Sequence, residues 1–128
     1  MIYLDASVVI AHLMMEDRMP AASIWSEQLT SSRILQYEVW TVINSRGSTR
    51  ALGEQARALF DRIDSIELEY DVLQRALEPF PLPLRTLDAM HIATADYLRR
   101  EGRPVRFASY DRRQLEVAKK LGFELAEI

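Results

Sequence analysis

Four acidic residues stand at positions where an α/β protein would bring catalytic groups together. Asp5 and Asp111 each follow a short apolar segment of strand character. Asp88 opens a strongly apolar helical segment, and Glu38 lies in the first turn of another predicted helix. In a parallel sheet the carboxyl ends of strands and the amino ends of helices share one edge, so we expect these carboxylates to converge. Converging carboxylates raise one another's pKa unless a divalent cation keeps them ionised.

An all-oxygen site of this kind suits Mg²⁺ or Mn²⁺. The chain contains no cysteine, which excludes thiolate metal sites and a thiol nucleophile. Phosphodiester hydrolysis fits such a site, because the reaction needs charge stabilised on a phosphoryl oxygen and a hydroxide delivered in line. Each acid taken alone is compatible with a helix cap or an ordinary surface charge, so the hypothesis depends on the four together.

Two serines and one histidine lie beside these acids in the sequence. Ser7 follows Asp5 by two residues and Ser109 precedes Asp111 by two, so we predict that each serine orients its neighbouring carboxylate. His91 lies one helical turn beyond the acid of the central helix. For this histidine, packing with a hydrogen bond to the backbone is the favoured interpretation.

A fifth acid, Asp96, is excluded from the expected site by its spacing. It lies eight residues beyond Asp88 on the same predicted helix, and this places it about 12 Å further along the axis at 1.5 Å per residue. We therefore expect Asp96 on a polar face or paired with an arginine. Several arginines are predicted on or near the acidic edge, where they would grip a phosphate backbone, although solvated surface charge is the ordinary role of each. They are Arg46, Arg50, Arg85, Arg112 and Arg113, of which Arg85 and Arg112 are the two assigned to substrate binding.

Alternating strands and helices account for most of the chain. The patterns predict strands at 2–4, 33–35, 66–70, 105–108 and 123–125, and helices at 6–13, 21–29, 37–44, 53–63, 72–77, 87–100 and 112–122. Asp5, Thr86 and Asp111 are the predicted caps of their helices. Such alternation is typical of an α/β sandwich built around a mainly parallel sheet.

Length and composition narrow the class of protein. With 128 residues we expect one domain, residues 1–128. The net charge of −3 argues against a strongly basic nucleic-acid-binding surface, but 14 of the 16 basic residues are arginine, the residue best suited to grip phosphates. No apolar run approaches the roughly 20 residues of a membrane span. Because the first residues enter a strand directly, we expect no signal peptide and a cytoplasmic protein.

Several motifs resemble a known family over essentially the whole chain. They are Tyr-Leu-Asp-Ala-Ser at 3–7, Glu38, Leu-Asp-Ala-Met-His-Ile-Ala-Thr-Ala at 87–95 and Ser-Tyr-Asp at 109–111. Together they resemble the PIN-domain family and, within it, the toxin ribonucleases of VapBC-type toxin–antitoxin pairs. The resemblance implies a PIN-like three-layer sandwich, with a mainly parallel central sheet flanked by helices and an acidic pocket of Asp5, Glu38, Asp88 and Asp111.

The resemblance also implies an activity and partners. Members of the family are endoribonucleases that use Mg²⁺ or Mn²⁺, form homodimers and are silenced by an antitoxin whose tail enters the active-site cleft. In this sequence Asp5, Asp88 and Asp111 would hold one or two cations. Glu38 would hold a second ion or orient the attacking water as a base.

Two other classes of protein remain open on the sequence. A PIN-like binding module would dock a partner through an apolar face with little activity of its own, and a non-toxin metal-dependent nuclease would act on other nucleic acid. A phosphatase-type phosphotransferase usually needs a second aspartate two residues after the first, and that position holds Ser7.

Overall fold

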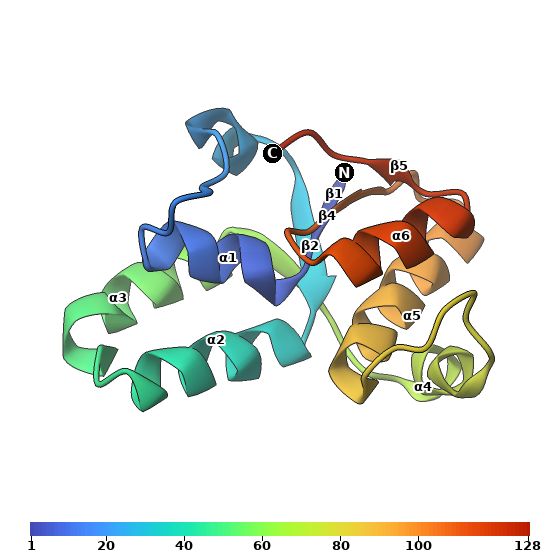
Figure 1. Cartoon of the computed structure of the whole chain (residues 1–128), viewed down its shortest axis with the longest axis horizontal. Coiled ribbons are helices and arrows are strands. Elements are labelled where there is room, and N and C mark those ends of the chain that lie inside the picture. Colours follow the sequence, from blue (N-terminus) through green and yellow to red (C-terminus); the bar gives the residue numbers. More distant parts are fainter.

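A five-stranded parallel sheet runs through the middle of the protein (Figure 1). The structure is a computed structural model that describes residues 1–128. Its strands are β1 (Ile2–Leu4), β2 (Leu29–Ser32), β3 (Ile63–Ile66), β4 (Arg106–Ala108) and β5 (Glu124–Leu125), in the spatial order β3-β2-β1-β4-β5. Every neighbouring pair is parallel, so the predicted α/β fold with a parallel central sheet is confirmed.

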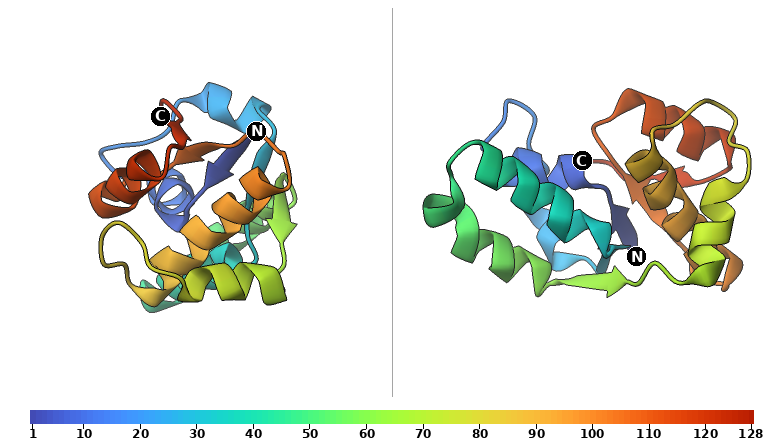
Figure 2. Two further views of the ribbon diagram at one scale, coloured as in Figure 1. Left: turned by 90° about the vertical axis from the view of Figure 1, so that its right-hand side faces the viewer. Right: turned by 90° about the horizontal axis from the view of Figure 1, so that it is seen from below.

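Helices cover both faces of the sheet. They are α1 (Ala6–Leu13), α2 (Ile34–Ser45), α3 (Thr49–Phe60), α4 (Tyr70–Leu77), α5 (Thr86–Arg100) and α6 (Arg112–Lys120), with a short 3₁₀ helix at Ala22–Ser26. Figure 2 shows α1 to α3 on one side of the sheet and α4 to α6 on the other. None of these helices has the length and apolar character that a membrane span requires.

The three layers follow from the alternation of side chains along β1. Ile2 and Leu4 point into the core shared with α1, α2 and α3. Tyr3 points the opposite way, into the core shared with α5 and α6, where its ring stacks on Phe107 at a centroid distance of 5.5 Å. A strand whose side chains are buried on both faces is what a central parallel strand requires.

The order of the strands creates a switch point at β1. From β1 the chain moves outward through β2 to β3, and it then crosses to the other side of β1 to form β4 and β5. The loops that leave the carboxyl ends of β1 and β4 therefore diverge, and in open α/β sheets such a place forms the ligand-binding crevice. Asp5 and Ser109 each directly follow one of these two strands.

The segment 21–35 corrects two predictions. The predicted helix at 21–29 is wrong, because only Ala22–Ser26 is helical and the next element is β2 (Leu29–Ser32). The predicted strand at 33–35 is also wrong, since α2 begins at Ile34. The sequence Leu-Thr-Ser-Ser carries no apolar alternation, yet all four residues are buried. Hydrogen bonds to neighbouring strands, such as the 2.6 Å bond from Ser31 Oγ to the Leu4 carbonyl, make these hydroxyls tolerable inside the sheet.

Several other boundaries shift by a few residues. Helix α3 begins at Thr49 and ends at Phe60, earlier at both ends than the predicted 53–63. Strand β3 is Ile63–Ile66, so the alternating segment 66–70 mostly follows the strand instead of forming it. Parallel pairing with β2, from Leu29 opposite Ile63 onward, decides this register. The predicted cap Thr86 is the first residue of α5, whose cap position is held by Arg85 without a side-chain bond.

Candidate active site

Asp5 lies at the junction of β1 and α1 and is almost wholly buried, with 2 % of its surface exposed. As the predicted N-cap of α1, it accepts a 3.0 Å hydrogen bond from the Ser7 amide through Oδ1. The Ser7 hydroxyl donates to the same oxygen at 2.5 Å, and the Ser109 hydroxyl donates to Oδ2 at 2.6 Å. Burial raises the pKa of Asp5, the two serine hydroxyls oppose this, and the nearby charge of Glu38 adds to the rise.

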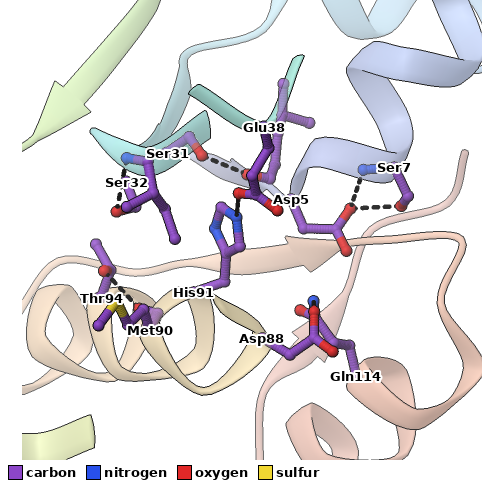
Figure 3. Close-up of polar contacts among 12 residues, drawn as sticks. Asp5, Ser7, Ser31, Ser32, Glu38, Asp88, Met90, His91, Thr94 and Gln114 are labelled. Atoms are coloured by element: carbon purple, nitrogen blue, oxygen red, sulfur yellow. Dashed lines mark hydrogen bonds and ion pairs between the residues drawn. The ribbon is translucent and has the colours of Figure 1, made fainter. Parts of the chain in front are cut away.

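The two serines join the loops that follow β1 and β4. The Tyr110 amide donates to Ser7 Oγ at 2.9 Å, and the Asp111 amide donates to Ser109 Oγ at 2.9 Å. Each serine hydroxyl therefore accepts a hydrogen bond from the loop that follows β4 and donates a hydrogen bond to Asp5. Ser7 orients its neighbouring carboxylate as predicted, but Ser109 orients Asp5 and touches only the backbone of Asp111 (Figure 3 shows Asp5 and Ser7).

Asp88 faces this junction from the first turn of α5 (Figure 3). Its Oδ1 accepts a 2.7 Å hydrogen bond from Gln114 Nε2 of α6. Partial burial raises the pKa of Asp88, the Gln114 bond opposes this, and the charges of Asp111 and Glu38 raise it further. Asp111 is exposed and caps α6 as predicted, through a 3.0 Å bond from the Gln114 amide to its Oδ1.

Glu38 enters the site from α2 and is held by a histidine. Its Oε1 lies 2.5 Å from His91 Nε2, and His91 Nδ1 lies 2.8 Å from the hydroxyl of Tyr3. His91 is completely buried. The expectation that this ring bonds to the backbone is wrong, because both of its nitrogens meet side chains. The structure thus adds Tyr3, His91 and Gln114 to the surroundings of the acids.

The acidic side chains are neighbours without being neutralised. The negative charge of Glu38 raises the pKa of both Asp5 and Asp88, and the negative charge of Asp111 raises the pKa of Asp88. No arginine or lysine forms an ion pair with any of the four acids, and His91 is the sole ion-pair partner of Glu38. The structure therefore leaves several carboxylates at one edge with hydroxyl, amide and imidazole groups around them and no arginine or lysine paired with them.

The donor chemistry suits a hard divalent cation. All the candidate ligands are carboxylate oxygens, and Gln114 Oε1 is a buried oxygen beside Asp88 with no hydrogen-bond partner. In the present side-chain arrangement, however, no three Asp, Glu or His side chains lie close enough together to hold one ion. One Asp111 oxygen is engaged in capping α6. By residue type and charge, these side chains fit Mg²⁺ or Mn²⁺. Binding one ion would require Asp88 and Asp111 to turn toward Asp5.

The candidate arginines are only partly at this edge. Arg85 and Arg113 line a cavity of about 550 Å³ together with Asp88 and Asp111. Arg112 is exposed in the first turn of α6 and does not line this cavity. The other two lie elsewhere: Arg46 is the C-cap of α2, about 12 Å further along the helix axis than Glu38, and Arg50 lies in the first turn of α3. The expectation that they lie on the acidic edge is wrong.

Asp96 lies apart from the acids, as its spacing predicts. It is buried near the carboxyl end of α5, where Arg75 Nε donates to it at 2.7 Å and Arg99 donates to it at 2.8 Å. Arg100 adds a longer contact of 3.3 Å. The predicted pairing with arginine is confirmed, whereas a place on a polar face is not.

A family comparison agrees with this arrangement. The family model described as the PIN domain matches residues 2–120. The chain belongs to the PIN-domain family. This PIN domain is 31% identical over 133 residues to Ribonuclease VapC47 of Mycobacterium tuberculosis, covering 98% of this chain and 96% of that protein. It is 33% identical over 126 residues to Ribonuclease VapC46 of the same species, covering 94% and 92%.

Solved structures share the fold of this PIN domain. Mycobacterium tuberculosis VapC20, a toxin that cleaves the sarcin-ricin loop, matches with a TM-score of 0.66 at 18% identity over 100% of both chains. A toxin–antitoxin complex from Klebsiella pneumoniae matches with a TM-score of 0.67 at 17% identity over 90% of each chain. The predicted resemblance to the PIN-domain family and to VapC proteins is confirmed.

Tyr3, which sequence reasoning missed, and His91, whose partners it assigned wrongly, both carried a signal. Tyr3 precedes Asp5 by two residues in extended backbone, and alternate residues of such a segment share a face. His91 follows Asp88 by three residues on one helix, which also places them on one side. Gln114 carried no comparable signal, because its contact depends on how α6 packs against α5.

Proposed function

We propose that this protein is a Mg²⁺- or Mn²⁺-dependent endoribonuclease that acts in the cytoplasm as the toxin of a type II toxin–antitoxin pair. One observation carries the proposal. Asp5, Glu38, Asp88 and Asp111 gather at the switch point of a PIN-domain sheet, and no arginine or lysine neutralises them. The names of the two similar ribonucleases support RNA as the substrate.

Each acid has a role in the proposed reaction. Asp5, Asp88 and Asp111 would hold the cation, which when bound supplies charge stabilisation at a phosphoryl oxygen and eases ionisation of water. Ser7 and Ser109 fix the orientation of the Asp5 carboxylate. Glu38 has one oxygen tied to His91, and we assign the other to orienting and deprotonating the attacking water.

The arginines beside the acids would bind the RNA backbone. Arg85 and Arg113 line the cavity next to Asp88, and Arg113 also donates to the Pro83 carbonyl at 3.2 Å, which steadies the loop before α5. Arg112 lies on the rim and would contact a more distant phosphate. A guanidinium suits this role, because its fork of donors matches a phosphate.

The same excess of negative charge fits an antitoxin partner. A partner arginine would fork onto these carboxylates in place of the cation. Assembly as a homodimer and with the antitoxin would also cover the exposed apolar side chains of Tyr70, Leu73 and Leu77, which lie along one face of α4. The Klebsiella structure is a complex of this kind for a protein of the same fold.

Cleavage of labelled RNA by the purified protein tests the activity. We expect cleavage with Mg²⁺ or Mn²⁺, none with a chelator, and none by Asp88→Asn. Equal activity with and without chelator would contradict the role of the cation. Cleavage of DNA but not RNA would favour the non-toxin nuclease.

Expression in a bacterial host tests the biological role. The wild type should stop growth and reduce translation, and Asp5→Asn should restore growth. Co-expression of a small DNA-binding protein encoded by the adjacent gene should also restore it. Arrest that persists in the Asp5→Asn, Asp88→Asn double variant would show that toxicity does not come from nuclease chemistry.

A further inference from the structure

A buried chain of hydrogen bonds leads from the sheet to Glu38. The Ser32 amide donates to the Tyr3 hydroxyl at 3.1 Å, the hydroxyl meets His91 Nδ1 at 2.8 Å, and His91 Nε2 meets Glu38 Oε1 at 2.5 Å. Tyr3 and His91 are fully buried, whereas the Glu38 side chain is 18% exposed. The chain therefore runs from the core of the protein to the surface of the acidic site, where Figure 3 shows His91 pointing at Glu38.

The hydrogen-bond donors and acceptors along this series of hydrogen bonds decide where each proton lies. Tyr3 is fully buried, and a phenol carries its proton at neutral pH. The phenol oxygen already accepts from Ser32, and its own proton points to His91 Nδ1. Nδ1 is then an acceptor, and the ring proton sits on Nε2, from which it is donated to Glu38. This is the tautomer in which each buried polar atom of the chain has a partner.

We infer that His91, with its tautomer set by Tyr3, is a positioning residue that holds Oε1 of Glu38 and leaves Oε2 facing the other acids. This inference rests on the proposed function for its catalytic consequence. A partly exposed carboxylate would otherwise sample several rotamers, and fixing one oxygen removes that freedom. Oε2 has no hydrogen-bond or ion-pair partner in the protein, which is what a group reserved for water or substrate requires.

Nitrogen NMR of the imidazole tests the positioning itself and needs no activity. In ¹⁵N-labelled wild type, we expect His91 to show a protonated Nε2 and a bare Nδ1, with the Nε2 proton protected from exchange. Tyr3→Phe should shift the Nδ1 resonance, because it removes that donor and keeps the ring stacked on Phe107. Glu38→Ala should abolish the protection of the Nε2 proton. A proton found on Nδ1, or an Nε2 proton indifferent to Glu38→Ala, would overturn the inference.

Kinetics of RNA cleavage then test the consequence. His91→Leu should lower kcat by at least about tenfold with KM nearly unchanged, because general-base catalysis contributes roughly 10²–10⁴-fold. His91→Gln should recover much of this loss, since its amide N–H₂ can donate to Glu38 in place of Nε2. Tyr3→Phe should show a smaller loss of kcat. In a Glu38→Ala background, His91→Leu should cost nothing further, because groups that act as a unit are not additive.

Thr30→Val is the matched control. Thr30 pairs with Tyr3 across the sheet, is fully buried, and bonds only to the Asp64 carbonyl at 3.0 Å. Its substitution removes a buried hydroxyl without touching Glu38, so the folded protein should keep its kcat. If His91→Leu behaved like this control, or cost as much without Glu38 as with it, His91 would be only structural. A wild type with the expected NMR spectrum that cleaves no RNA would refute the proposed function and leave the positioning intact.

Discussion

The two ends of α5 each carry an aspartate, and the two aspartates lie in opposite electrostatic environments. Asp96 near the carboxyl end is buried and receives arginine contacts from Arg75, Arg99 and Arg100. Asp88 in the first turn of the same helix is half-buried, forms no ion pair and accepts one hydrogen bond, from the amide of Gln114. The two aspartates are only eight positions apart on one helix, so helix propensity and composition do not explain the contrast.

The pKa values move in opposite directions for reasons that can be named. Burial raises the pKa of Asp88, and the neighbouring acids add to the rise beyond what the Gln114 bond offsets. Burial would also raise the pKa of Asp96, but the bonds from Arg75 and Arg99 and the charge of Arg100 outweigh it and hold the pKa low. Asp96 is neutralised by arginines of the protein, whereas the charge of Asp88 is not neutralised by any group of the protein.

This contrast separates stability from function. A lowered pKa contributes stability that is present above the ordinary value of 3.8 and is lost as the pH falls through the folded value. A raised pKa does the reverse, so the charged forms of Asp5 and Asp88 cost stability at neutral pH and are retained despite that cost. Groups retained against stability are candidates for function.

The largest expected effect is on activity. Asp88→Asn should reduce RNA cleavage by more than about a hundredfold, the scale of losing an electrostatic stabiliser at a reacting centre. Its thermal stability should stay level or rise, because the Asn oxygen still accepts from Gln114 and one repulsive charge is gone. Asp96→Asn should keep most of its activity per folded molecule. If Asp96→Asn were inactive and Asp88→Asn active, the two ends of α5 would have been assigned in reverse.

The next effect is on stability, at the other end of the helix. Asp96→Asn should lower the free energy of unfolding by about 3–5 kcal/mol, because it leaves the buried Arg75 without its carboxylate. Urea denaturation would measure this. Glu78→Gln is the matched control, since it contacts Arg75 at 3.6 Å from an exposed position, and exposed pairs contribute about 0–1 kcal/mol. Equal losses in both variants would mean that burial does not distinguish the Asp96 pairs.

A third effect depends on the cation. Mn²⁺ at about 100 times its Kd should stabilise the wild type by about 2.7 kcal/mol, because the unfolded chain does not gather the acids. The gain in melting temperature should shrink in Asp5→Asn and remain in His12→Gln, a change in the last turn of α1, at the opposite end of the helix from Asp5. The gain should also fall on acidification, as Asp5 and Asp88 take up protons below their raised pKa values. Equal gains in melting temperature in the wild type and in Asp5→Asn would contradict the proposal that a cation binds at this edge.

The smallest effect concerns pH and stability without metal. At pH 7, Asp5→Asn should be neutral or more stable than the wild type, by no more than about 1 kcal/mol. That difference should shrink as the pH falls toward 3.8, because the wild-type carboxylate becomes protonated in the folded state first. Denaturant titrations between pH 7 and pH 4 would follow it. A wild type that lost stability relative to Asp5→Asn on acidification would show a lowered pKa at Asp5 instead.

Strong local signals made much of the fold and site predictable. The short strand Ile2–Leu4, the cap Asp5 and the helix after it were all predicted correctly, because an apolar run followed by a capping residue needs little context. The cap at Asp111 is similar. The gathering of three acids at one edge also follows from local features, since Asp5 and Asp111 follow strands and cap helices and Asp88 lies in the first turn of α5. Glu38 was predicted in the first turn of its helix, but it is the fifth residue of α2, which begins at Ile34.

Tertiary structure alone decided the remaining features, for reasons of packing. Strand β2 has the sequence Leu-Thr-Ser-Ser, and only its place between β1 and β3 buries it and occupies its hydroxyls. The partners of His91 come from a strand and a helix that lie 88 and 53 residues away in the chain. The sequence by itself determined which residues carry charge and that Asp5 and Asp111 cap the helices that follow them. Which charges are neutralised, as at Asp96, and which are left open, as at Asp88, was decided by how helices from distant segments pack side by side.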